Sequence, residues 1–191
     1  MHKYNIVLVV VVGCWFLPVT SRAQNTNIYP PAPATKLEAL ETNTSTIIIK
    51  GFTLIGSLSI NSETVSVTCK EDTDTTTGRK EHGIAVGVKV NDQPEDRMII
   101  DYDEMDSLLN AIDYLSKISW SVTSLTGFDA FYATKGGFRV AAFGSKRGGT
   151  IEFSLRSSHM GKGILITPSE LAQFRGLIDQ ARRNLDAIRP K

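Results

Sequence analysis

A capped amphipathic segment occurs twice in the chain, first from Ile100 and again from Ile166, and this repeat limits the folds available more than any other feature. The positions that match are Ile100, Asp101, Glu104, Met105, Leu108, Ile112 and Asp113 in the first copy, and Ile166, Thr167, Glu170, Leu171, Phe174, Ile178 and Asp179 in the second. In each copy a helix-capping residue stands three positions before a Glu, which is the signature of a capping box. Apolar residues then recur at spacings of three and four, which predicts one buried helix face.

Four segments with strand character precede each of these helices. In the first copy strand character is expected at 47–49 and 52–60, with bends or bulges at Gly51 and Gly56, and at 64–70, 82–90 and 97–100, with 71–81 as a long exposed hairpin loop. In the second copy they are expected at 128–134, 138–143, 150–156 and 163–166. The sequence therefore predicts an α+β fold: a tandem duplication of a four-stranded antiparallel sheet followed by one helix (ββββα × 2). Chance likeness between two capped amphipathic helices is the alternative.

This order of elements resembles that of three groups of single-stranded nucleic-acid binders. They are the plant Whirly proteins, the purine-rich-element binding proteins and the human transcriptional coactivator with a single-strand-binding domain. The resemblance covers about residues 52–188 and rests on element order alone. It implies a fold and transfers no functional residue to this chain.

Residues 1–23 have the pattern of a secretory signal peptide. A basic start precedes an apolar run from Ile6 to Leu17, and Ser21-Arg22-Ala23 places small residues where signal peptidase needs them. The run is too short to span a bilayer as a helix, so a secreted or periplasmic mature chain is expected, without a transmembrane helix. Val11-Val12-Gly13-Cys14 offers a rival site, at which lipidation of Cys14 would anchor the protein.

Beyond Ala23 the sequence divides into three further segments. Residues 24–45, with Pro30, Pro31 and Pro33, are expected to form a polar tether. Residues 46–120 and 121–191 then hold the two repeats, expected as one compact domain. Cleavage at Ala23 leaves Cys69 as the one remaining cysteine, and its place on the apolar face of an alternating strand predicts a buried, inert thiol.

Charge is distributed unevenly between the two halves of the mature chain. Residues 24–130 hold 8 basic and 16 acidic side chains, whereas residues 131–191 hold 11 basic and 4 acidic ones. Arg139, Lys146, Arg147 and Arg156 lie on the second set of strands and turns, interleaved with aromatic residues, and are expected to cluster on an exposed edge. Such a surface suits a polyanion, for instance a single-stranded nucleic acid, a wall polymer or an acidic lipid. The alternative is that the two halves pair with each other within the monomer or across a homodimer.

The residues of the sequence do not form a recognisable catalytic or metal-binding set. His and Cys lack zinc-ligand spacing, no cofactor motif is present, and the carboxylates from Asp101 to Asp106 are explained by a helix N-terminus. We therefore expect an exported, non-enzymatic binding or interaction module. Polyanion binding through the basic second repeat is the first alternative, and an enzyme of unrecognised type is the second.

Overall fold

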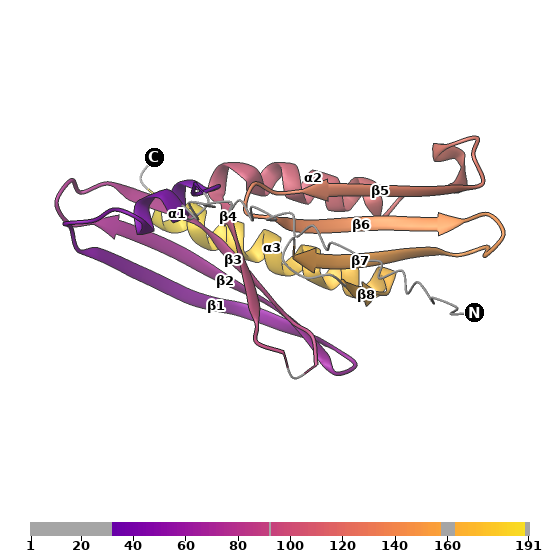
Figure 1. Ribbon diagram of the computed structural model, residues 1–191, viewed down its shortest axis with the longest axis horizontal. Coiled ribbons are helices and arrows are strands. Elements are labelled where there is room, and N and C mark those ends of the chain that lie inside the picture. The colour runs from indigo at the N-terminus through magenta and orange to yellow at the C-terminus, as the bar shows by residue number, and fades with distance from the viewer. Residues whose placement is uncertain (1–31, 92, 158–162, 190–191) are drawn as a thin grey trace, which may run out of the picture. The chain divides into compact units, whose positions relative to one another are not determined.

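The computed structural model describes residues 32–91, 93–157 and 163–189, which form two four-stranded antiparallel sheets and several helices (Figure 1). The fold is therefore α+β, as the sequence predicts. The expected signal peptide, both candidate processing sites and the start of the expected tether lie outside the described residues.

The first sheet has its strands in sequence order: β1 (Ile48–Ile60), β2 (Glu63–Asp74), β3 (Lys80–Lys89) and β4 (Asp96–Asp101). A 3₁₀ turn, η1 (Tyr102–Glu104), leads into α2 (Met105–Leu115), and a second, η2 (Trp120–Val122), follows. The second sheet is also in sequence order: β5 (Gly127–Ala133), β6 (Phe138–Ser145), β7 (Ile151–Ser157) and β8 (Ile164–Ile166). The helix α3 (Pro168–Ile188) follows it.

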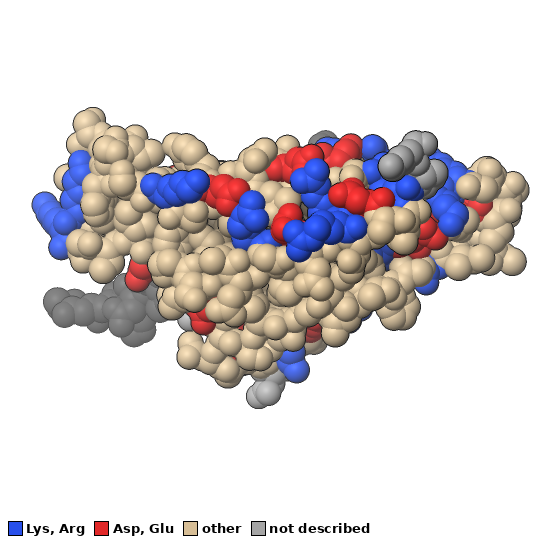
Figure 2. All heavy atoms as spheres, turned by 180° about the vertical axis from the view of Figure 1, so that it is seen from behind, with Lys and Arg blue, Asp and Glu red and all other residues tan. Residues whose placement is uncertain are grey.

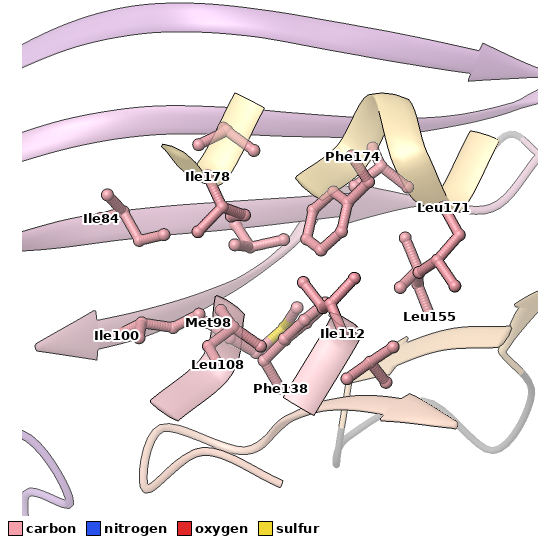
Figure 3. Packing of buried hydrophobic residues seen from close by; sticks show 14 of the residues in the cluster. Ile84, Met98, Ile100, Leu108, Ile112, Phe138, Leu155, Leu171, Phe174 and Ile178 are labelled. Atoms are coloured by element: carbon pink, nitrogen blue, oxygen red, sulfur yellow. The ribbon is translucent and has the colours of Figure 1, made fainter. Parts of the chain in front are cut away.

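Each of the two long helices packs mainly on the sheet of the other half. The helix α3 crosses the inner face of the first sheet, where Leu177 lies against Gly56 and the Cys69 thiol donates to the Ala181 carbonyl at 3.5 Å. The helix α2 contacts β5 and β6 of the second sheet. One continuous hydrophobic core results, in which Phe138 of β6 lies 5.5 Å from Phe174 of α3, between ring centroids (Figure 3).

A short helix occupies part of the segment that the sequence assigns to the tether. The helix α1 (Lys36–Glu41) begins at a capping box formed by Thr35 and Glu38, and it buries Leu37 and Leu40. Leu37 lies over Gly83, where a Cβ would come within 2.7 Å of the leucine methyl carbon. The end of the expected tether is therefore packed on the outer face of the first sheet.

The capping box expected at Asp101 and Glu104 does not form. The Asp101 carboxylate instead accepts the backbone N–H groups of Lys36 at 2.8 Å and Leu37 at 3.3 Å, at the start of α1. Glu104 accepts the backbone N–H of Lys135, in the turn between β5 and β6, at 2.9 Å. Both carboxylates thus bind N–H groups distant in sequence, and α2 begins at Met105 after a 3₁₀ turn. The corresponding box at Thr167 and Glu170 is confirmed at the start of α3.

The loop expected at 71–81 is wrong for most of its length. Strand β2 continues to Asp74 and β3 begins at Lys80, so the turn is confined to the residues between them. Asp72 and Asp74 of this strand are both buried. The Lys70 nitrogen lies 3.4 Å from Asp72, and the Thr46 hydroxyl donates to Asp74 at 2.6 Å. Polar composition alone therefore misplaces this strand pair.

The strand β1 is continuous through Gly51, and its pairing with β2 stays in register there, so the bend or bulge expected at Gly51 does not form. Its pairing with β2 shifts register between Leu54 and Gly56, at the second expected bend. Among the described residues, no helix is both long and apolar enough to cross a membrane.

Candidate binding surfaces

Two arginines face each other on the outer side of the second sheet. Arg139 of β6 and Arg156 of β7 are direct cross-strand partners, and both are half-buried. Their neighbours Val140 and Leu155 are fully buried beneath the sheet, so strand alternation directs both guanidinium groups away from the core. Like charges in direct register repel each other, so this pair favours an anion placed between them.

The arginine pair lies in a shallow hollow of about 400 Å³. Its lining also includes Phe143, Ser154 and Leu165, and Asp129 stands at the same surface. Arg139 stacks on the ring of Phe131, with its guanidinium carbon 3.9 Å from the ring centroid. Within the described part of the chain, neither arginine forms an ion pair with a carboxylate.

Lys146 and Arg147 do not join this pair. They lie in the turn that follows β6, at the opposite end of the strand from Arg139, and both are exposed. The Lys146 ammonium donates to the carbonyls of Thr123 at 3.2 Å and Ser124 at 3.5 Å. The expected cluster of four cations is therefore wrong: the strand length divides it into a pair on the sheet face and a pair at the hairpin tip.

Two basic residues of α3 have acidic partners on α2. Arg175 makes a two-point contact with Asp113, at 2.6 and 2.8 Å, and Arg182 lies 2.7 Å from Asp106. Basic and acidic side chains accordingly stand side by side on the face seen from behind (Figure 2). Pairing between the acidic and basic halves thus accounts for these arginines but not for Arg139 and Arg156.

The first sheet has a larger hollow on its outer face, of about 780 Å³. Phe52 and Leu54 of β1 stand on one side, Glu95 and Arg97 on the other, and Ala85 and Gly87 of β3 form its floor. A Cβ on Gly87 would lie 2.2 Å from a carboxylate oxygen of Glu95, so a larger residue at this position would displace the Glu95 side chain. The cations that line the groove are already paired, since Arg97 contacts Glu95 at 2.6 Å and Lys50 contacts Glu41 at 2.5 Å.

A partly buried charge cluster borders this groove. Glu41 of α1 accepts from both Lys50 and Lys70, and the Lys70 nitrogen lies 3.4 Å from Asp72. Burial, together with the neighbouring Glu41, raises the pKa of Asp72 to about 6. Burial acts in the same direction on Glu41, but hydrogen bonds from Lys50 and Lys70 outweigh it and lower the pKa of Glu41 to about 2.

His82 and Cys69 are both buried and have structural partners. The His82 ring nitrogen lies 3.0 Å from Glu71, its neighbour across β2 and β3. Burial raises the pKa of the Cys69 thiol to about 11, which keeps it protonated, in agreement with the expected inert thiol. Ser157 donates to Asp96, while His159 lies outside the described residues. Across the described ranges, His, Cys, Asp and Glu do not gather into a group that could hold a metal ion.

No known family model matches the chain, and the curated proteins contain no significant match to it.

The surface that sequence reasoning missed is the groove of the first sheet. Its signal is present in the sequence, since Lys50, Phe52 and Leu54 alternate along one strand. The alternation shows that these side chains share one face of the sheet. It does not show that α1 leaves the part of this face around Phe52 and Leu54 uncovered.

Proposed function

We propose that this chain is an exported, non-enzymatic binding module that holds an anionic ligand on the outer face of its second sheet. An interaction module for a ligand of another kind is the broader form of the same proposal. The described residues lining the hollows on the two outer faces include serines but no histidine that could activate them as a base, which favours binding over nucleophilic chemistry.

The observation that carries the proposal is the cross-strand register of Arg139 and Arg156. Arginine presents a fixed fork of donors that suits carboxylate, sulfate and phosphate oxygens. The stacked Phe131 ring is about half exposed, so a flat group of a ligand could lie beside the same guanidinium. A polyanion would gain two adjacent charge-assisted contacts and relieve the repulsion between the two arginines.

Heparin affinity chromatography tests the proposal, because the structure supplies a matched control. The variant Arg139→Ser/Arg156→Ser removes the sheet pair, and Lys146→Ser/Arg147→Ser removes the same number of charges at the hairpin tip. We expect the wild-type mature protein to elute above physiological salt, the sheet variant to elute much earlier, and the tip variant to elute close to wild type. Equal shifts for both variants would indicate general charge attraction, and elution of the wild type below physiological salt would remove the proposal.

Export is a separate part of the proposal and rests on the segment from Met1 to Ala23. Mass spectrometry of the protein recovered from a secreting host should show a mature chain that begins at Gln24. An acylated terminus at Cys14 would establish a lipid anchor instead. Full-length protein retained in the cytosol would exclude both forms of export.

We also propose that the two sheets and the helices after them arose by tandem duplication. Aligning Ile100 with Ile166 places Leu108 of α2 on Phe174 of α3, and both of these side chains are fully buried in the shared core. The exchange of helices between the sheets agrees with two equivalent units packed about a local two-fold axis. The units have since diverged, because α2 has 11 residues against 21 in α3.

A further inference from the structure

The edge strand β1 exposes an unusual number of apolar side chains. Ile49 is 58% exposed, Phe52 78% and Leu54 63%, and Ile47 just before the strand is also exposed. Strand alternation places Phe52 and Leu54 on the outer face and Ile49 on the inner face. In the segment Ile48–Leu54, which precedes the register shift, both faces of β1 therefore carry exposed apolar side chains.

This edge lacks the features that usually prevent strand pairing. The segment contains no proline, and its one charge, Lys50, is paired with Glu41 of the same chain. The other described edges differ. Strand β8 has only three residues, β5 carries Asp129, and β4 is covered by the turn between β5 and β6, where Gly136 abuts Ile99.

We propose that β1 pairs antiparallel with β1 of a second copy of this chain, forming a dimer through one continuous sheet. On its outer edge β1 has no strand partner among the described residues, so its outward backbone donors and acceptors specify a strand as the occupant. A second copy suits this edge, because an antiparallel strand pair is self-complementary about a two-fold axis. Figure 1 shows β1 as the outermost strand of its sheet.

The extent of the segment Ile48–Leu54 fixes the register of the pairing. An axis at Gly51 uses its whole length and sets Lys50 opposite Phe52 and Ile48 opposite Leu54 of the second copy. A register centred on Lys50 would oppose two ammonium groups, and like charges directly opposite are destabilising. On the outer face the two grooves would become continuous across the axis, since Phe52 and Leu54 line each of them.

The inner face offers a matching knob and hollow. A hollow of about 510 Å³ borders the edge where Gly51 has no side chain, and Thr53, Leu185 and Ile188 line it. In the register centred on Gly51, Ile49 of the second copy stands opposite Thr53, at this hollow. The half-exposed Ile188 would be covered by the same contact.

Sedimentation velocity of the mature chain, compared with two lysine variants, tests the pairing. We expect the wild type to sediment as a dimer at micromolar concentration and Ile49→Lys to sediment as a monomer with an unchanged circular dichroism spectrum. Leu125→Lys, at a site that is also largely exposed but lies outside β1, should remain dimeric. A monomeric wild type, or a dimer that survives Ile49→Lys, would overturn the proposal.

The register has its own test, through paired cysteines. Lys50→Cys/Phe52→Cys should form disulfide-linked dimers on mild oxidation, because the two positions are opposite each other across the proposed axis. Neither single variant should do so efficiently, and the native Cys69 is buried. Equal cross-linking by the two single variants would exclude the register centred on Gly51. These outcomes do not depend on anion binding by the second sheet.

Discussion

At the scale of single residues, Asp72 carries a carboxylate in an unfavourable setting. It is fully buried, neither oxygen accepts a hydrogen bond from a described residue, and its pKa is raised from 3.8 to about 6. A raised carboxyl pKa means that the folded state binds the proton more tightly than the unfolded state. Stability from this group is therefore greatest below pH 4 and falls as the pH rises toward 6. Glu41 acts in the opposite direction, and its stabilisation is lost as the pH falls from 4.5 toward 2.

The variant Asp72→Asn should separate the pH dependence of stability that comes from Asp72 from the one that comes from Glu41. Asparagine cannot ionise, so we expect the variant to lack the loss of stability between pH 4 and 6 and to be at least as stable as the wild type at pH 8. Urea unfolding at pH 4, 6 and 8 measures this directly. A variant that is destabilised equally at all three values would show that the Asp72 charge does not control the profile.

Sequence reasoning at this scale succeeds where a residue follows strand alternation. The outward direction of Arg139 and Arg156 and the burial of Cys69 all follow from period-two patterns. It fails for Lys146 and Arg147, because their distance from Arg139 depends on where β6 ends. Nor does local sequence show that Glu41 is a neighbour of the buried Asp72, since Glu41 lies on α1, far from Asp72 along the chain.

At the scale of elements, the two helix starts show what a capping signature can predict. Thr167 and Glu170 form the reciprocal box, with Pro168 in the first turn. Asp101 and Glu104 have the same spacing, yet both carboxylates bind N–H groups of other elements. The two helix starts differ because of tertiary contacts. Near Asp101 and Glu104, α1 and the turn between β5 and β6 present N–H groups that have no partner within their own element, and the two carboxylates accept them.

The proposed duplication predicts equivalent roles for the two helices. Phe174→Ala should destabilise the protein by about 3–5 kcal/mol and Leu108→Ala by about 2–5 kcal/mol, because each leaves a cavity in the same core. Leu125→Ala, at an exposed position, should change stability by less than about 0.5 kcal/mol. Chemical denaturation provides these values. A negligible effect of Leu108→Ala would show that α2 is not an equivalent of α3.

At the scale of the described molecule, the exchange of helices joins the two sheets into one core. Sequence patterns predict both sheets, both apolar helix faces and the order of the elements. They do not predict which helix covers which sheet, since either arrangement buries Leu108 and Phe174. The same limit applies to charge, because the sequence shows an acidic and a basic half but not which residues pair. The packing of α3 on α2 pairs Arg175 and Arg182 with carboxylates, whereas no carboxylate among the described residues pairs with Arg139 or Arg156.

This difference between paired and unpaired arginines is the basis of the proposed function, and the salt dependence of binding tests it most directly. Titration of a fluorescent heparin oligosaccharide at several salt concentrations gives the slope of log affinity against log salt, which counts the cation contacts to the ligand. We expect Arg139→Ser/Arg156→Ser to lower that slope by about two and Lys146→Ser/Arg147→Ser to leave it nearly unchanged. An unchanged slope in the first variant, or an equal loss in the second, would contradict an anion site on the second sheet.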